Sequence, residues 1–282
     1  MADSAASDSR PAARVRQRER LDRISALLDD RPFWSVAELA TRFDVSEETV
    51  RRDVRQLEQS GRARKMHGGV SLPGGRIEAP YRVRLREQAA AKQRIGRAAT
   101  AAVQPGMTLL IDSGSTSFWL ARALVGMRDL TIVTNSVEIA YEMLGRPGQR
   151  VFLAGGRINA DYHAAFDAGA LAYARGFVPD LAVLSITAIE AERGFLDFDA
   201  DEAMFKRALL DRARRVMVVA DATKFARQGA CHVTGFGEVD ELVTDAAPPA
   251  SIAAAAAAAG MAIRIAGEDQ SSATATPRTD SA

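Results

Sequence analysis

The hydrophobic pattern near the start of the chain predicts two short helices joined by a polar turn. The first helix carries an apolar stripe at helical spacing, made of Val36, Leu39, Ala40 and Phe43. A second stripe follows the break at residues 44–46 and is made of Val50, Val54 and Leu57. A serine precedes each helix as a candidate N-cap, Ser35 with Glu38 as a capping box and Ser46 before the second helix. An earlier helix that packs on this pair is predicted from the spacing of Leu21, Ile24 and Leu28.

The opposite face of the second helix is polar and basic. Arg51, Arg52 and Arg55 flank or oppose the apolar stripe, and arginine side chains suit guanine edges and phosphates. A helix of this width fits the major groove, which predicts a helix-turn-helix that grips duplex DNA. After the helix end at Gly61, residues 62–70 (RARKMHGGV) predict a basic hairpin or strand, the wing. We expect DNA contacts from Ser46, Thr49, Arg51, Arg52, Arg55, Arg64, Lys65 and His67. The alternative interpretation is a helical hairpin whose basic face is merely solvated.

From residue 106 onward, apolar strands alternate with helices. The predicted strands are 108–112, 130–135, 150–156, 180–186, 215–221, 240–245 and 261–266. The predicted helices are 87–104, 116–125, 136–144, 200–213 and 249–259. Continuous apolar strands between helices are typical of an α/β domain with a largely parallel sheet. The predicted fold class is therefore α/β, with an N-terminal winged helix-turn-helix and a C-terminal α/β domain.

Composition shifts divide the chain into five expected segments. Residues 1–17 and 267–282 are expected to be disordered. Between them we expect a winged helix-turn-helix over 18–72, a linker over 73–86 and the α/β domain over 87–266. Residues 1–86 hold 18 Lys and Arg against 13 Asp and Glu, whereas the remainder holds 19 against 23. A basic module is thus joined to an acidic body, which fits DNA as the partner of the first module.

Polar residues gather where the predicted strands end, and this is where ligands bind in parallel sheets. Residues 112–117 (DSGSTS) follow the first strand and open a helix, an arrangement that suits a phosphate. The expected ligand-binding residues are Asp112, Ser113, Gly114, Ser115, Thr116, Asn135, Gly155, Gly156, Glu202, Lys206, Asp221 and Lys224. Each also has a structural interpretation, because the aspartates could cap helices, the glycines could form turns, and Glu202 with Lys206 could be a surface pair. Together they favour a small anionic ligand.

Composition narrows the chemistry further. The single Cys231 excludes an internal disulfide and a cysteine-cluster metal site, and the three separated histidines disfavour a histidine metal site. No G-x-G-x-x-G or G-x-x-x-x-G-K-[ST] motif is present, which disfavours dinucleotide and P-loop sites. We therefore expect no metal and no cofactor. The sequence shows no apolar run of spanning length and no signal core, so we expect a cytoplasmic protein without a membrane partner.

The chain resembles the DeoR family of bacterial transcription regulators over about residues 18–246. The resemblance is carried by the winged segment LATRFDVSEETVRRDVRQLEQSGRARKMHGGV and, in the body, by KQRIG (92–96), IDSGST (111–116), VTNS (133–136), LAGG (153–156), EAMFKRALL (202–210) and VVADATKF (218–225). It implies a repressor released by a phosphorylated sugar or related metabolite, a body similar to ribose-5-phosphate isomerase, and a homo-oligomer, either dimer or tetramer. GFLDFDADE and the residues near 245–249 look most like the glycerol-3-phosphate-responsive branch.

The sequence departs from the family pattern at the ligand-facing edge. Ser185 and Ala188 stand where the family usually carries glycine, and residues 161–168 lack glycines that are often found there. Larger side chains at these places would reshape the pocket.

Three functions compete. The leading hypothesis is a ligand-controlled repressor of carbohydrate or glycerol genes that is not an enzyme, with operator DNA and a phosphorylated sugar or glycerol-3-phosphate-like effector as partners. Its effector phosphate would sit on residues 113–116, with charge added by Lys206 and Lys224. The alternative is a phosphosugar isomerase- or deaminase-like enzyme with a DNA-binding appendage, since the same carboxylates and lysines could shuttle protons. An architectural DNA-binding protein without a ligand would leave the polar strand ends unexplained.

Overall fold

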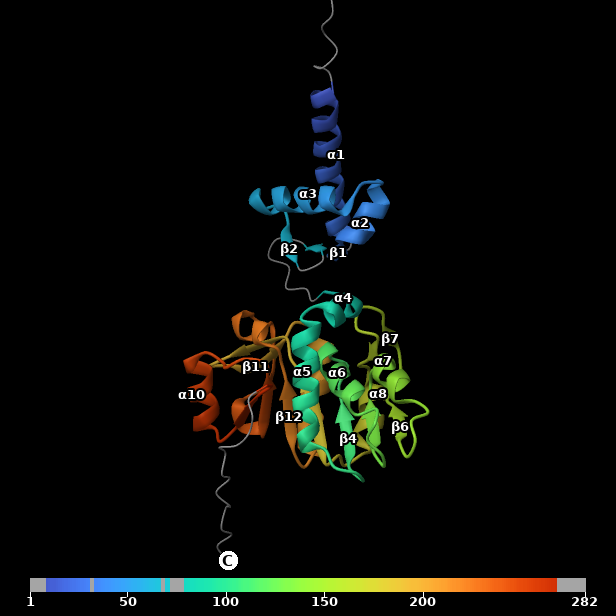
Figure 1. The fold of residues 1–282 in the computed structure, drawn as a ribbon, viewed down its shortest axis with the longest axis vertical. Helices are drawn as coiled ribbons and strands as arrows, with labels where there is room; N and C mark the ends of the chain where they lie inside the picture. Colours follow the sequence, from blue (N-terminus) through green and yellow to red (C-terminus); the bar gives the residue numbers. More distant parts are fainter. Residues whose placement is uncertain (1–8, 31–32, 67–68, 72–78, 268–282) are drawn as a thin grey trace, which may run out of the picture.

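The computed structural model describes residues 9–30, 33–66, 69–71 and 79–267 (Figure 1). The amino-terminal module consists of α1 (Ser9–Asp30), β1 (Phe33–Ser35), α2 (Val36–Phe43), α3 (Glu47–Gln59), β2 (Arg64–Met66) and β3 (Gly69–Ser71). The three strands form one antiparallel sheet in the order β1-β3-β2. The predicted helix-turn-helix and wing are therefore confirmed as a fold.

The local signals that predicted the module are present in the structure. Ser35 Oγ accepts a hydrogen bond from Glu38 N at 3.1 Å, and Ser46 Oγ accepts one from Thr49 N at 3.3 Å. Both apolar stripes pack with the earlier helix into one small core, whose fully buried members include Ile24, Leu39 and Val50. Burial of these stripes is what holds the three helices together.

Two of the expected segment boundaries differ from the structure. Residues 1–8 and 268–282, expected to be disordered, lie outside the described residues, but α1 already begins at Ser9. Alanine, arginine and glutamine dominate this stretch and favour a helix. The expected linker 73–86 also holds a helix, α4 (Tyr81–Arg86). Tyr81 is buried in the core of the body and its amide donates to Asp161 O at 2.8 Å, so α4 belongs to the body and the linker ends before it.

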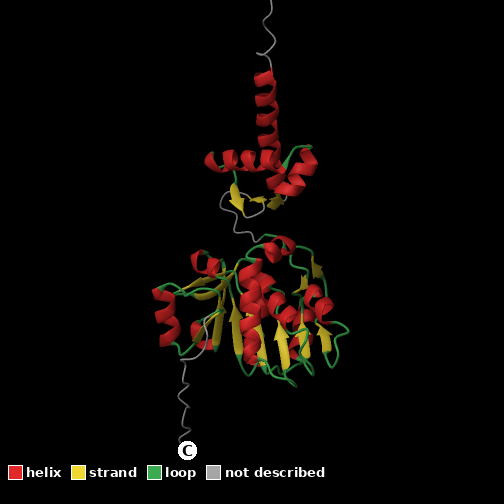
Figure 2. Ribbon diagram, viewed as in Figure 1, coloured by secondary structure: helices red, strands yellow, loops and turns green. Residues whose placement is uncertain are grey.

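All seven predicted strands form, and they form one parallel sheet. Its order is β15-β14-β12-β9-β4-β5-β6. The strands are β4 (Thr108–Ile111), β5 (Thr131–Thr134), β6 (Arg150–Leu153), β9 (Leu181–Ser185), β12 (Val216–Val219), β14 (Glu241–Thr244) and β15 (Ala262–Ile265). Every pairing within this sheet is parallel. Figure 2 shows the strands lying between helices, as expected for an α/β body.

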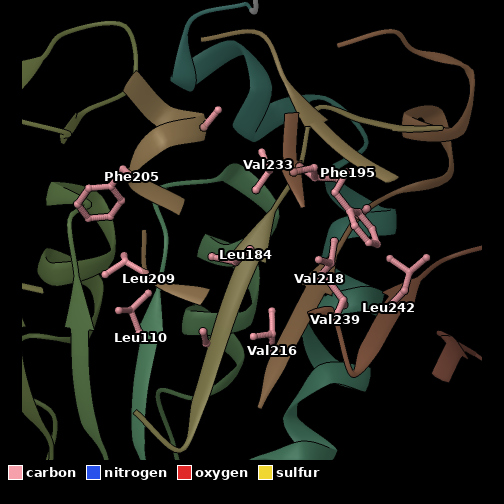
Figure 3. Close-up of a cluster of buried hydrophobic side chains, with 14 of the residues drawn as sticks. Leu110, Leu184, Phe195, Phe205, Leu209, Val216, Val218, Val233, Val239 and Leu242 are labelled. Atoms are coloured by element: carbon pink, nitrogen blue, oxygen red, sulfur yellow. The ribbon is translucent and has the colours of Figure 1, made fainter. Parts of the chain in front are cut away.

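Alternate residues of each strand feed two different cores. In β4, Leu109 and Ile111 join one core and Leu110 joins the other. The first core packs against α5 (Ala89–Ala99), α6 (Ser115–Ala123) and α7 (Val137–Met143). The second core packs against α8 (Ala168–Arg175), α9 (Ala200–Arg207) and α10 (Ala250–Ala258). Figure 3 shows part of this second core, where Phe205 and Leu209 lie near Leu184 and Leu110. Burial on both faces explains the continuous apolar strands.

The sequence did not predict α8 or the short strands outside the main sheet. These strands are β7 (Ile158–Asn159), β8 (Ala164–Ala165), β10 (Ala188–Glu190), β11 (Gly194–Asp197) and β13 (Cys231–Thr234). The last three form a small antiparallel sheet in the order β10-β11-β13. Among the helices that the structure describes, none is long and apolar enough to cross a membrane.

Candidate functional site

Helix α3 presents its basic face to solvent. Val50, Val54 and Leu57 are buried, which leaves Arg51, Arg52 and Arg55 exposed. Ser46 and Thr49 lie at the start of the same helix, where their hydroxyl oxygens are 2.9 Å apart. Ser46 therefore acts as the N-cap of α3, and Thr49 remains half-buried beside it. The structure brings five of the eight expected DNA-binding residues onto this single helix end and face.

Two of the three arginines are held by glutamates of the first turn. Arg51 Nη2 lies 2.5 Å from Glu47 Oε2, and Arg55 Nη2 lies 2.8 Å from Glu48 Oε1. These side chains are about half exposed, so such pairs contribute little stability and can open in favour of phosphates. Arg52 makes no ion pair with any residue that the structure describes, so its charge is the most available of the three.

A buried acid that the sequence did not flag fixes α3 in place. Asp53 is fully buried on α3, and its carboxylate accepts hydrogen bonds from Arg20 Nε at 2.5 Å and from Gln17 Nε2 at 3.0 Å. Both donors lie on α1, so the pair ties α1 to the helix that carries the basic face. Asp53 sits between exposed arginines in the sequence, which is why it resembled one more surface charge.

The wing carries Arg64 and Lys65 on β2, and both side chains are exposed. The Lys65 amide donates to Glu58 Oε1 at 3.1 Å, which links the wing to the end of α3. Gly69 on β3 lies so close to β1 that a Cβ there would be 2.4 Å from Trp34 O. Glycine is therefore required for this strand pairing. His67, the remaining expected contact, lies outside the described residues.

The second candidate site lies at the point where the main sheet changes direction. The chain runs outward from β4 through β5 to β6, then crosses back to β9 and continues through β12, β14 and β15. Ligands in open α/β sheets bind outside the strand ends at such a switch point. Asp112 follows β4 there, and its Oδ2 accepts a hydrogen bond from the amide of Ser185, the last residue of β9, at 2.9 Å.

Lys206 lies at the centre of a buried acidic cluster at this point. Its Nζ donates to Ser185 O at 2.8 Å, Asp197 Oδ2 at 2.9 Å and Glu202 Oε1 at 2.8 Å, and it lies 3.3 Å from Asp112 Oδ2. Burial alone would lower the pKa of Lys206, but the three carboxylates outweigh it and hold that pKa well above its ordinary value. Because its three N–H donors are already used within the cluster, we expect Lys206 to position the carboxylates rather than to donate to a ligand phosphate.

A group of cations lies close to the start of α6. Lys92 is buried on α5 and donates to Ser115 Oγ at 3.0 Å and to Arg84 O at 2.6 Å. Burial, with Lys224 next in importance, lowers the pKa of Lys92 to about 8. Asp221 lies within electrostatic reach of both lysines. Burial would raise the pKa of Asp221, but Lys224, Thr223 and Lys92 together lower it.

Arg84 is the third cation at the pocket and comes from α4. Its guanidinium carbon lies 5.7 Å from the ring centre of Tyr81 and 5.0 Å from that of Tyr162. Stacking of this kind holds a guanidinium in place. Arg84 falls within the predicted linker and Lys92 within the KQRIG motif, so neither was predicted as a site residue. Asp197 was missed as well, although the GFLDFDADE segment that contains it was noted.

Most of these groups line one small hollow. Its lining comes from the start of α6, the end of β9, the acidic cluster and two of the cations. The lining residues are Arg84, Gly114, Ser115, Thr116, Ser185, Ile186, Thr187, Asp197, Glu202, Lys206 and Lys224. The hollow therefore has a cationic side and an acidic side. Such a polarity fits a ligand with an anionic group at one end and hydrogen-bond donors at the other.

Six of the twelve expected ligand residues do not line this hollow, namely Asp112, Ser113, Asn135, Gly155, Gly156 and Asp221. Asn135 is buried at the end of β5, where its side chain donates to Ala165 O at 2.9 Å. Gly155 and Gly156 follow the edge strand β6 and are exposed, and a Cβ at Gly156 would be 2.5 Å from a carboxylate oxygen of Asp167. Ser113 is buried behind the lining residues and does not line the hollow. In the described part of the chain, no group of His, Cys, Asp and Glu side chains could hold a metal ion.

Both modules of the chain match models of known protein families. The model for the DeoR-like helix-turn-helix domain matches residues 20–74, and the model for the DeoR C terminal sensor domain matches residues 87–246. The glycerol-3-phosphate regulon repressor of Escherichia coli is 32% identical over 84% of this chain and 94% of its own length. The HTH-type transcriptional repressor CsqR of Escherichia coli is 31% identical over 83% of this chain and 89% of its own length.

Solved structures give a more distant likeness. Ribose 5-phosphate isomerase A of Methanocaldococcus jannaschii is 13% identical, with a TM-score of 0.36 over 49% of this chain and 54% of the isomerase. A likeness of this size carries no conclusion about activity.

Proposed function

The chain belongs to the DeoR family of transcriptional regulators, and from this premise we propose that a small phosphorylated polyol or sugar, bound at the switch point, releases it from operator DNA. The family and its named repressor relatives identify a DNA-binding regulator rather than an enzyme. The observation that carries the proposal is the cationic side of the hollow, where Arg84, Lys92 and Lys224 meet the first residues of α6. Buried cations beside a helix N-terminus favour a phosphate.

The acidic side of the hollow supports a hydroxyl-bearing ligand. Asp112, Asp197 and Glu202 surround a single lysine, so three negative charges face one positive charge. Carboxylate oxygens accept hydrogen bonds from ligand hydroxyls. We propose that the phosphate lies against Ser115, Thr116 and the three cations, and that the hydroxyls point toward the carboxylates. The relative named as a glycerol-3-phosphate regulon repressor makes glycerol 3-phosphate the first ligand to test.

Helix α4 offers a physical link between the ligand and DNA. It follows the segment after the wing, and its residue Arg84 both lines the hollow and accepts a hydrogen bond from Lys92 through its backbone oxygen. A ligand that pulls on Arg84 therefore acts on the element nearest in sequence to the DNA-binding module. Release also requires that the ligand bind the DNA-incompetent arrangement more tightly than the competent one.

We further propose that the protein acts as a homo-oligomer, a dimer or tetramer, in the cytoplasm. One winged module over about 18–72 reads few base pairs, and a symmetric assembly would multiply its contacts. Support comes from the side of the body around edge strand β6, where Tyr141, Leu144, Tyr173 and Val178 leave large apolar side chains exposed. Apolar groups of this kind are typical of association surfaces.

A thermal-shift screen of phosphorylated metabolites on the full chain tests the proposal. A ligand that binds only the folded state raises its stability by about 2.7 kcal/mol at a hundred times Kd. We expect a clear rise of the melting temperature with glycerol 3-phosphate or another short phosphorylated polyol, and none with the dephosphorylated compound. Equal shifts for the phosphorylated and dephosphorylated compounds would remove the phosphate from the proposal.

A further inference from the structure

The side chain of Ser185 binds a hydrogen-bond donor in the first turn of α6. Its Oγ accepts a hydrogen bond from the amide of Ser117 at 2.9 Å and lies 2.9 Å from Ser117 Oγ. Ser117 is in the first turn of α6, whose amides have no partner inside the helix and are the groups that hold an anion. The hydroxyl of Ser185 thus takes one of these donors before any ligand arrives.

The side chain of Ser185 also fills space beside Gly114. A Cβ placed on Gly114 would lie 2.0 Å from the Cβ of Ser185, so the two residues are in direct contact where the loop enters α6. Ser185 and Gly114 both line the hollow. Ser185 therefore forms part of the wall that keeps the hollow small.

Ser185 is held firmly in this position. Its amide donates to Asp112 Oδ2 at 2.9 Å, and its carbonyl oxygen accepts from Lys206 Nζ at 2.8 Å. The strand that it ends, β9, is paired on both sides, with β4 and with β12. A ligand cannot gain room by displacing this residue without breaking contacts of the acidic cluster.

We propose that Ser185 is a specificity-determining residue, which restricts the site to short phosphorylated polyols and excludes hexose phosphates. Its hydroxyl replaces one ligand oxygen at α6, and its side chain fills the space into which a longer carbon chain would extend. The phosphate is then left to Ser115, Thr116 and the cations Arg84, Lys92 and Lys224. The inference rests on the proposed function, since it concerns the same phosphate-binding hollow.

Two substitutions separate the effect of the Ser185 hydroxyl from the effect of the space that the side chain fills. Ser185→Ala removes the oxygen and keeps the Cβ, whereas Ser185→Gly removes both. Titration calorimetry on the full chain would compare glycerol 3-phosphate, ribose 5-phosphate, fructose 6-phosphate and inorganic phosphate for the wild type and both variants. We expect Ser185→Gly to raise the affinity for fructose 6-phosphate relative to glycerol 3-phosphate by about 10- to 200-fold, the range that one small group in a pocket gives. Ser185→Ala should free the Ser117 amide and raise the affinity for inorganic phosphate. The ratio of the affinities for fructose 6-phosphate and glycerol 3-phosphate should change little.

The outcomes distinguish a failure of the role of Ser185 from a failure of the proposed function. If the wild type binds glycerol 3-phosphate and Ser185→Gly leaves the ratio unchanged, the role of Ser185 is refuted while the proposed function stands. If neither the wild type nor either variant binds any phosphorylated ligand, the proposed function fails and the inference fails with it. Thermal unfolding of each variant serves as the check that the body is folded. Should Ser185→Gly not fold, inorganic phosphate binding by Ser185→Ala tests the role of the hydroxyl, and an affinity equal to that of the wild type would refute it.

Discussion

The ammonium of Lys92 donates a hydrogen bond to Ser115 Oγ at 3.0 Å, which places a buried cation of α5 against the first residue of α6. Because burial and Lys224 lower the pKa of Lys92 to about 8, this cation titrates near neutral pH. A bound phosphate favours the charged form of Lys92. The proposed ligand should therefore bind more weakly as pH rises through 8, by up to about tenfold per pH unit.

The check is a series of ligand titrations between about pH 7.5 and 9.5, where the phosphate itself is almost fully ionised. Lys92→Arg keeps its charge over this range and serves as the matched control. We expect a falling affinity in the wild type and a flatter profile in Lys92→Arg. Parallel profiles in the two proteins would show that another group is responsible.

Lys206→Ala should destabilise the body. The substitution leaves Asp112, Asp197 and Glu202 buried together without their cation, and breaking a buried ion pair in this way costs about 3–5 kcal/mol. Met204→Ala, an exposed site on the same helix, should change the free energy of unfolding by less than about 0.5 kcal/mol. Denaturant unfolding of both variants decides the matter, and a Lys206→Ala protein as stable as the wild type would contradict the cluster.

Asp53→Ala should weaken the amino-terminal module. It removes the acceptor of Arg20 and Gln17 and leaves the mostly buried guanidinium of Arg20 without its carboxylate. We expect a loss of about 1.5–3 kcal/mol, the worth of hydrogen bonds to charged groups. Calorimetric unfolding of the full chain measures it. A transition unchanged from the wild type would mean that α1 is not fixed to α3 through Asp53.

Arg52→Ala should weaken operator binding by about 1–3 kcal/mol if Arg52 contacts a base edge, and should then relax sequence preference. Arg23→Ala is the matched control, since Arg23 is an exposed arginine of the same module whose nearest acid is Glu19 on its own helix. An operator selected from random DNA and a scrambled duplex would be titrated at one fixed salt concentration. Wild-type binding of both duplexes by Arg52→Ala would remove Arg52 from the interface.

The main sheet could be predicted because its strands are buried on both faces. Such strands appear in the sequence as apolar runs, which can be recognised without knowing which strands pair. The strands β10, β11 and β13 could not be predicted, because they pair with segments that only the tertiary fold brings beside them. The module was predictable from its caps and stripes, which are local signals.

The candidate site was predicted only in part, for a topological reason. Polar residues follow most of the strands, but of the main-sheet strands only β4, β9 and β12 are followed by, or end in, residues that line the hollow. Asn135 and Gly155 follow β5 and β6, which lie on the side of β4 away from β9. The local hydrophobic pattern does not reveal the order of strands in the sheet. Asn135 and Gly155 were therefore predicted to share one site with Asp112. Arg84 and Lys92 resembled surface charges because their burial arises only when α4 and α5 pack on the body.

The central claim is that a phosphorylated ligand at the cationic side of the hollow releases this regulator from DNA. The most direct measurement is a titration of the protein–operator complex with glycerol 3-phosphate and with glycerol, for the wild type and for Lys224→Ala. The account predicts release of the wild type by the phosphorylated compound alone. It also predicts that Lys224→Ala binds the operator normally and needs at least about tenfold more ligand for release. Release by glycerol at equal concentration, or identical release curves for the two proteins, would contradict it.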